Sequence, residues 1–401
     1  PQARIMILIS GLTLACALPQ NAYSAVLAGL QRYDVIAGTN MLACGLRLLV
    51  ILLLLRECGG GNGLILLAVA AGGTYLLGAL LRTLAALRLC RQVQFRPWRV
   101  ERAKLRPIIE FGMNSVIYMM SVHVGLQLAQ IVVGAMMGTE KAADLNVAGT
   151  FLLAIHAFVV AFGISGRVVA SRYDGENNDR MIRHLLLRST RYSSFLTFAG
   201  VAALALFADG LFRVWVGRNY TGPGGEVALA SVVQTCRLLL CGYGLFWLML
   251  PAYNVVNGMG LHRFPAVVTL ASALLSLSLV GVLATTREAS IVRVAWGIVL
   301  PMVPVWGAVI PWYCCRQTRQ PIGLFVWEGI VGPLVAVLPV GVIGLVWNEL
   351  APADAWAPLV FRVAVCGTLV LAIGWFFVLR SDDRRAMIAS CLRTRDRMLG
   401  K

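Results

Sequence analysis

The sequence predicts an all-α protein that crosses a lipid bilayer about eleven times. Of its 401 residues, 59% are hydrophobic and only 13% are charged, and the mean hydropathy is +0.78. Soluble globular domains are about 45–50% apolar and about 25% charged, so a soluble core does not hold this excess. Apolar runs of about 20 residues recur along the chain, and each is long enough to cross a hydrocarbon core of roughly 30 Å as a helix.

Short breaks with charged, glycine or proline residues separate these runs. The first run follows Arg4 and resembles a secretory signal, but it continues through Pro19 to Leu30 as one apolar stretch. We therefore predict a spanning helix there. The predicted spans, in order, are residues 5–28, 36–55, 64–87, 108–137, 146–170, 194–216, 227–250, 265–284, 291–313, 323–347 and 358–379.

The basic residues predict the orientation of the chain. When the breaks are assigned to alternating sides, 25 of the 35 Lys and Arg fall on one side, including eight from Arg82 to Arg106 and seven from Arg380 to Lys401. Eight fall on the other side, and Arg47 and Arg237 lie inside spans. Because basic residues favour cytoplasmic loops, the C-terminus is predicted to be cytoplasmic. The net charge of +17 then indicates contact with membrane lipids, and no nucleic-acid partner is expected.

Two of the cytoplasmic connections are long, residues 88–107 and 171–193. The second is predicted to contain an amphipathic helix on the membrane surface. No Cys/His spacing typical of a metal site is present, and no catalytic motif can be assembled from the sequence. We therefore expect no cofactor, no metal and no enzymatic activity.

Arg47 and Arg237 are the first candidates for a functional site, because a charge inside a spanning helix is costly and usually faces a bundle interior or a cavity. Neither has an acidic residue at comparable depth in the predicted spans, since Asp209 and Glu328 lie at span ends. One interpretation is that a substrate supplies the anion. The alternatives are snorkelling, hydrogen bonding to carbonyl groups, or pairing with a carboxylate in an N-terminal part that this sequence is expected to lack.

Two polar stripes accompany these arginines. Gln234 lies one turn before Arg237, and Asn254 follows toward the cytoplasmic end of the same run. The run 108–137 carries His123, Gln127 and Gln130 at spacings of three and four. These stripes are typical of a cavity wall. For His123 and for His156 in the next run, proton coupling and an inter-helix hydrogen bond are both open, and we favour the hydrogen bond.

Three segments resemble the lipid-linked oligosaccharide flippases of the multidrug/oligosaccharidyl-lipid/polysaccharide exporter superfamily, which include the O-antigen flippases. VLAGLQRYDVIAGTN at 26–40 is similar to a short cytoplasmic hairpin of the family. LAQIVVGAMMGTEKAADLNVAGTF at 128–151 is similar to its seventh and eighth helices, and YNVVNGMGLHRFPAVVTL at 253–270 to the link between helices ten and eleven. Many relatives carry an acidic–basic pair where this sequence has Ala129 and Gln130, so the role of that pair is not transferred.

The resemblance implies a two-lobed fold of fourteen helices, of which this sequence lacks the first three. Residues 1–90 would be the remainder of the N-terminal lobe, 91–107 a basic cytoplasmic linker, 108–313 the C-terminal lobe, 323–379 two additional helices and 380–401 a basic cytoplasmic tail. The implied location is the bacterial cytoplasmic (inner) membrane.

The function that the resemblance implies is flipping of isoprenoid pyrophosphate-linked oligosaccharide to the outer leaflet for surface polysaccharide biosynthesis. Its implied partners are that substrate, membrane lipids and polysaccharide polymerase machinery. Arg47 and Arg237 would hold the anionic head group. The alternatives are an exporter of small amphipathic molecules, a membrane-embedded glycan polymerase or ligase, and a structural scaffold.

Overall fold

The computed structural model describes residues 2–30, 32–57, 63–89, 102–286, 290–350 and 355–385. Within these ranges the protein is helical and has no strand. Among the described residues, ten helices are long and apolar enough to cross a membrane, and an eleventh span forms when a bent pair of helices is counted as one. The prediction of an all-α multi-pass membrane protein is confirmed. In hydrocarbon every backbone N–H and C=O needs a partner within the protein, which is why apolar runs of this length form helices.

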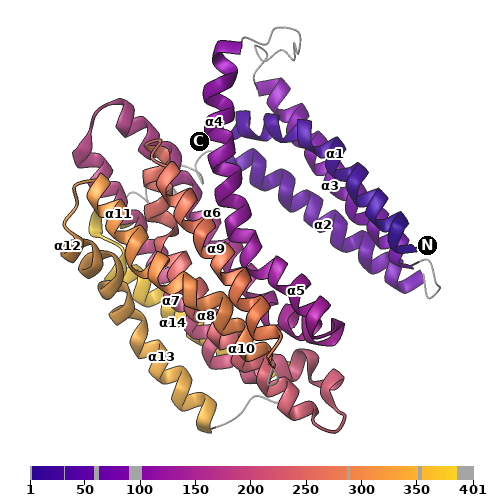
Figure 1. Cartoon of the computed structure of the whole chain (residues 1–401). Helices are drawn as coiled ribbons and strands as arrows, with labels where there is room; N and C mark the ends of the chain where they lie inside the picture. The colour runs from indigo at the N-terminus through magenta and orange to yellow at the C-terminus, as the bar shows by residue number, and fades with distance from the viewer. Residues whose placement is uncertain are drawn as a thin grey trace, which may run out of the picture. The chain divides into compact units, whose positions relative to one another are not determined.

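Two compact units divide the chain. The first, Pro1–Leu105, contains three long helices (Figure 1), and the lobe boundaries predicted above remain a prediction. α3 packs along both of the others, which contact each other much less. The helices are α1 (Gln2–Gly29), α2 (Tyr33–Glu57) and α3 (Gly63–Leu89).

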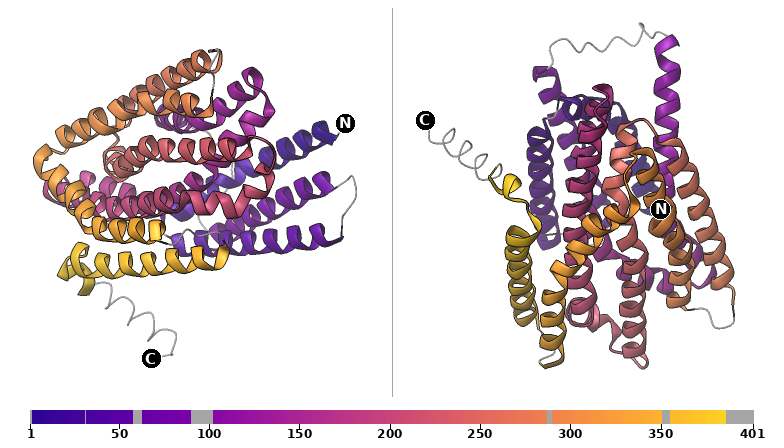
Figure 2. Two further views of the ribbon diagram at one scale, coloured as in Figure 1. Left: turned by 90° about the horizontal axis from the view of Figure 1, so that it is seen from below. Right: turned by 90° about the vertical axis from the view of Figure 1, so that its left-hand side faces the viewer.

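The second unit, Arg106–Lys401, contains the other helices, of which α4 begins slightly before the division. Figure 2 shows its long helices running side by side. Their bounds are α4 (Arg102–His123), α5 (Ala129–Met136), α6 (Thr139–Gly175), α7 (Asp179–Val216), α8 (Gly225–Gly258), α9 (Arg263–Ala284), α10 (Ile291–Pro304), α11 (Ile310–Gln317), α12 (Ile322–Val326), α13 (Gly332–Leu350) and α14 (Trp356–Ile373). In the described part of this unit, four π-helical turns continue or join these helices: Val124–Leu128, Val305–Val309, Trp327–Val331 and Gly374–Val378.

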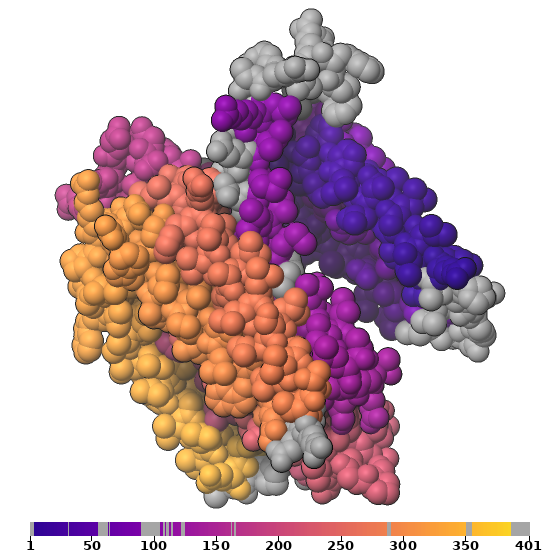
Figure 3. Space-filling model, in the orientation of Figure 1, coloured from indigo at the N-terminus to yellow at the C-terminus, as the bar shows by residue number. Residues whose placement is uncertain are grey.

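The core of the second unit lies around α8, which packs against α6, α7 and α10. Its large side chains Phe246, Trp247 and Tyr253 are almost completely buried. α9 packs on α10 and α5, and α13 and α14 pack on α7. Apolar side chains on the outside of the helices stay exposed, as expected for surfaces that lipid covers. In Figure 3 the helices from α9 to α13 form one continuous, closely packed face.

α6 and α7 are longer than a bilayer requires. They have 37 and 38 residues, which correspond to about 55 Å each, and the turn at Glu176–Asn178 joins them. Asn178 caps α7 by accepting a hydrogen bond from the Met181 N–H. The helix predicted within 171–193 is not a separate element: residues 171–175 end α6, and residues 179–193 form the first part of α7.

The cytoplasmic end of the second unit, by the predicted orientation, is held by charged side chains. Asp383 accepts a hydrogen bond from Tyr192 and pairs with Arg188 at 2.6 Å. Glu328, at the start of the α13 segment, pairs with Arg191 of α7 at 2.5 Å and with Arg380 at 2.9 Å. The residues after α14 are thereby tied to α7. The rest of the predicted basic tail, from residue 386, and residues 91–101 of the predicted linker lie outside the described residues.

Candidate functional site

The candidate site begins at a break in the span formed by α4 and α5. Residues Val124–Leu128 form a π-helical turn, and the two helical segments meet at a bend of 41°. A π-helical turn is rare and occurs often at functional sites, because it redirects the side chains that follow it. Gln127 lies in this turn, and Gln130 lies on the first turn of α5.

A pocket of about 270 Å³ lies beside the bend. Gln127 and Gln130 line it from one side, and Asn146 and His156 line it from α6. The Gln130 amide donates a hydrogen bond to Oδ1 of Asn146 across 3.3 Å, which joins the two walls. The remaining lining residues are Leu126, Gly149, Leu152, Leu153 and Tyr243.

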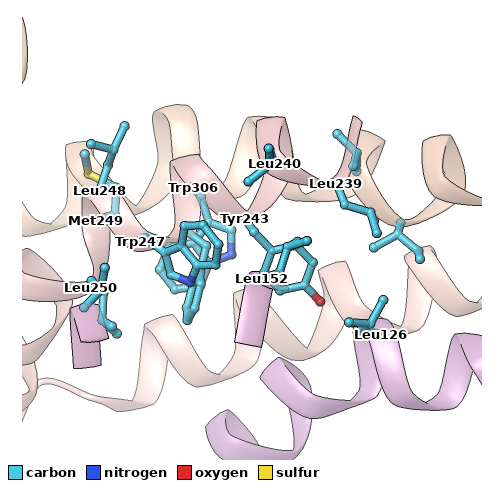
Figure 4. Packing of buried hydrophobic residues seen from close by; sticks show 14 of the residues in the cluster. Leu126, Leu152, Leu239, Leu240, Tyr243, Trp247, Leu248, Met249, Leu250 and Trp306 are labelled. Atoms are coloured by element: carbon cyan, nitrogen blue, oxygen red, sulfur yellow. The ribbon is translucent and has the colours of Figure 1, made fainter. Parts of the chain in front are cut away.

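Tyr243 of α8 closes the pocket. Figure 4 shows its ring beside Leu152, with the hydroxyl end on the side of Leu126. Gly125, in the π-helical turn, lies against this phenol: a Cβ built on it would be 3.7 Å from the Tyr243 hydroxyl oxygen, which is an ordinary van der Waals contact. The pocket therefore combines an apolar surface with a few hydrogen-bonding groups, as is typical of small-molecule sites.

Two aromatic residues of α8 contact His156 and orient its imidazole. Nε1–H of Trp247 donates a hydrogen bond to Nδ1 of His156 across 3.2 Å, and the imidazole stacks on Phe246 with ring centroids 5.7 Å apart. Indole N–H only donates, so Nδ1 is an acceptor and this bond selects the neutral imidazole. The prediction that His156 makes an inter-helix hydrogen bond is confirmed.

All the side chains that line the pocket from the described part of the chain are uncharged. Two amides from the π-turn segment, one from α6, an imidazole and a phenol offer both donors and acceptors. This combination suits hydroxyl groups, which donate and accept hydrogen bonds, better than it suits an isolated ion. The arrangement can orient a neutral polyhydroxylated ligand inside the bilayer.

Arg237 lies on another face of α8. Six residues separate it from Tyr243, which at 100° per residue places the two side chains on well-separated faces. Its guanidinium pairs with the Asp209 carboxylate of α7 and donates from Nε to the Ala205 carbonyl oxygen across 3.1 Å. The prediction that Arg237 has no acidic residue at comparable depth is therefore wrong. α7 extends past Asp209 to Val216, so this carboxylate lies within the helix and beside Arg237.

The other predicted site residues do not join the pocket. Gln234 is exposed on α8, one turn from Arg237, and Asn254 lies where α8 approaches Gly163 of α6. Arg47 is exposed on α2 in the first unit and makes no ion pair with the residues that the structure describes. The side chain of His123 lies outside the described part of the chain.

Sequence reasoning missed two kinds of residue. Asn146 and Tyr243 belong to the pocket, and only their polarity on apolar helices signalled them. Arg82, which the charge count placed among the basic residues of the cytoplasmic side, is buried within α3 with 8% of its surface exposed. Arg362, which the same prediction assigned to the outer side, is buried in α14 and lies over the Trp347 ring.

The bent span, the apolar bundle and the neutral polar pocket define an integral helical membrane protein that can hold a polar ligand inside the bilayer. Residues 1–222 match the model of a family described as "Polysaccharide biosynthesis protein", and the chain belongs to this family. The fold is similar to the solved structure "Lipid II flippase MurJ, inward closed conformation", with a TM-score of 0.60 and 12% sequence identity over 93% of this chain and 73% of that chain. No curated protein matches the chain.

These comparisons confirm the resemblance predicted from the sequence at the level of family and fold.

Proposed function

We propose that the protein flips an isoprenoid pyrophosphate-linked oligosaccharide from the cytoplasmic to the outer leaflet of the bacterial cytoplasmic membrane, for surface polysaccharide such as O-antigen or exopolysaccharide. Membership of a polysaccharide biosynthesis family and a fold similar to that of a lipid II flippase support this function. The observation that carries it is the uncharged polar pocket beside the bent span.

The chemistry of the pocket favours a glycan as the cargo. Each sugar hydroxyl donates one hydrogen bond and can accept two, and the pocket side chains Gln127, Gln130, Asn146 and His156 supply both donors and acceptors. Binding to neutral groups is weak enough to allow release on the far side. The protein is proposed to act as a transporter and not as an enzyme, with the site opening alternately to the two sides of the membrane.

Export of small amphipathic cations is the second candidate function. The structure supports it less than glycan transport. No carboxylate lines the pocket within the described part of the chain. The Asp209 carboxylate in the spanning region of α7 is already paired with Arg237. A cationic cargo would therefore meet no unpaired anion at this site.

The head group of the proposed substrate requires cations. We propose Arg47 and Arg237 for this role, because guanidinium groups match phosphate oxygens in geometry and charge. For Arg237 the proposal requires that the substrate anion competes with Asp209 or binds beside it.

The first experiment measures the lipid-linked glycan pool in cells that lack the protein. Accumulation of completed, cytoplasm-facing lipid-linked repeat units together with loss of surface polysaccharide is the expected result, because synthesis continues while flipping stops. An unchanged pool with normal surface glycan would contradict the proposal.

Complementation of the same cells tests the pocket. Replacing both Gln127 and Gln130 by Leu removes two hydrogen-bonding amides and is expected to reduce surface glycan at least about fivefold, since two lost hydrogen bonds of roughly 0.5–1.5 kcal/mol each sum to about 1–3 kcal/mol. The matched control is Ile131→Leu, because Ile131 lies on the same helix and is 66% exposed. Full complementation by the double variant would exclude the pocket as the glycan site.

A further inference from the structure

A second polar cluster lies inside the first unit and, unlike the neutral pocket, contains a charged side chain. Arg82 of α3 is 8% exposed and reaches both neighbouring helices. Its Nε donates to the Ser24 hydroxyl of α1 across 3.2 Å, and its Nη1 donates to Oδ1 of Asn40 of α2 across 2.5 Å. One guanidinium therefore joins all three helices.

The cluster lies at one depth. Ser24 is five residues before the end of α1, Asn40 is seven residues after the start of α2, and Arg82 is seven residues before the end of α3. Because the three helices alternate in direction, these positions share one end of the unit, about 7–10 Å from the helix ends. Arg32 and Arg88 mark that end as the predicted cytoplasmic one. The cluster thus lies just below the level of the cytoplasmic lipid head groups.

The charge of Arg82 is not balanced by the described part of the chain. Its two hydrogen-bond partners are neutral, and no carboxylate in the described residues pairs with it. Buried charges in spanning helices are normally paired, because desolvation without a counter-ion is costly. This cationic site therefore favours an anion.

The hydrogen-bonding groups that remain open are donors. Ser24 and Asn40 use their oxygens to accept from Arg82, which leaves the Ser24 O–H and the Asn40 NH₂ available to donate. Nη2 of Arg82 makes no hydrogen bond to the described residues and is not among the fully enclosed atoms, and Asn40 is exposed. A cluster of donors around one cation is complementary to a phosphate oxyanion, which only accepts.

We propose that Arg82, Asn40 and Ser24 form a binding site for a lipid-borne phosphate at the cytoplasmic end of the first unit. The inference rests on the proposed function and deepens it, since the same substrate carries a pyrophosphate next to its lipid. The anion has two sources with the same chemistry: the pyrophosphate of the lipid-linked glycan, or the phosphate of an anionic membrane phospholipid.

Asn40→Asp is the decisive variant. It places a carboxylate beside Nη1 of Arg82 at nearly unchanged volume, so it supplies an internal counter-ion. If Arg82 only joins the helices, this ion pair preserves the fold and leaves ligand binding as it was. If Arg82 binds phosphate, the variant keeps its stability but repels the ligand, so stability and affinity separate.

The measurement is ligand-induced thermal stabilisation of the purified full-length protein in detergent, because a ligand that binds the native state raises the midpoint of unfolding. The probes are farnesyl pyrophosphate, phosphatidylglycerol, and farnesol as the phosphate-free control. The wild type is expected to respond to the first or to both phosphates and not to farnesol. Asn40→Asp is expected to weaken that response at least about tenfold, as removal of a charge-assisted hydrogen bond does, with an unfolding midpoint at least equal to that of the wild type without ligand.

Two further variants complete the test. Arg82→Lys keeps the charge and is expected to bind more tightly than Asn40→Asp but less tightly than the wild type, because a guanidinium fork is lost. Arg32→Gln is the control, since Arg32 lies at the same end but is exposed and paired with Asp34 at 2.9 Å. It is expected to bind as the wild type does.

The outcomes separate the sources and the hypotheses. A stronger response to farnesyl pyrophosphate identifies the substrate pyrophosphate, and an equal response to phosphatidylglycerol identifies a membrane phospholipid. Wild-type affinity in Asn40→Asp, or an equal response to farnesol, would overturn the site even if the glycan pool shows that flipping occurs. Conversely, an unchanged glycan pool with phosphate binding intact would overturn the proposed function alone.

Discussion

At the scale of single residues, the sequence shows where the charged side chains are but not which groups they contact in the folded chain. Arg237 was recognisable as a cation inside a spanning run, but its pairing with Asp209 depends on where α7 lies against α8. Asp209 precedes Arg237 by 28 residues, and no spacing rule connects residues on two different helices. The burial of Arg82 was hidden for a similar reason: it lies near the end of the predicted span 64–87, and only the packing of α3 between its neighbours shows that its side chain is buried.

Exchange of the two charges in the Arg237–Asp209 pair tests whether Arg237 contacts the substrate. Arg237→Ala is expected to lower flipping of lipid-linked glycan in proteoliposomes at least about tenfold, the effect of losing a charge-assisted hydrogen bond of roughly 1.5–3 kcal/mol. The double exchange Arg237→Asp with Asp209→Arg is expected to restore the free energy of unfolding to within about 1 kcal/mol of the wild type, as for other half-exposed ion pairs. Flipping is expected to stay low, because the guanidinium is displaced to α7.

Recovery of flipping in the double exchange would show that the pair only joins α7 to α8. Arg237→Lys is the conservative comparison, and its expected flipping rate lies between those of the wild type and Arg237→Ala. Both side chains are about half exposed, at 44% and 51%, so the substitutions need no repacking of the core.

At the scale of helices, hydropathy predicted the spans and missed how they bend. Ten of the predicted spans correspond to apolar helices and the eleventh to the bent pair around Val124–Leu128. A π-helical turn changes the hydrogen-bonding pattern by one residue without changing the local hydropathy, so its position is not visible in an apolar run. The same one-residue offset decides which side chains enter the pocket, which is why Gln127 and Gln130 were predicted but Asn146 of α6 and Tyr243 of α8 were not.

Removal of one residue from the π-helical turn tests its role. Deleting Leu128 allows the segment to close as a regular α-helix and turns Gln127 by about 100° relative to Gln130. The deletion variant is expected to insert and to unfold within a few degrees of the wild type, while flipping of the lipid-linked glycan falls at least about tenfold. Leu128→Ala keeps the length of the segment and is expected to retain most of the flipping activity. Equal flipping by the deletion variant and the wild type would show that the turn does not orient the site.

At the scale of the whole molecule, the class of protein followed from composition, because nothing but a set of spanning helices accommodates so much apolar sequence with so little charge. The family followed from three short segments whose order and spacing agree with it, and the family match over residues 1–222 confirms it. The candidate site was predicted from the sequence less completely than the protein class and the family. Hydropathy is a property of each segment alone, whereas a pocket is made by side chains from three helices that meet only in the folded chain.

The orientation of the chain in the membrane is the last prediction, and it decides which end of each unit meets the cytoplasm. The turn at Glu176–Asn178 and the segment after α14 lie in the basic-rich set of breaks, whereas Gly222 lies in the turn before α8 and in the poorer set. Since Lys and Arg near helix ends favour the cytoplasmic side, green fluorescent protein fused after Lys401 is expected to fluoresce, and alkaline phosphatase fused there is expected to be inactive. Alkaline phosphatase inserted at Gly222 is expected to be active, because it reaches the outer side. The opposite pattern would place Arg82 at the outer end of its unit and make it a site of release, so the topology measurement also decides in which leaflet the proposed phosphate site acts.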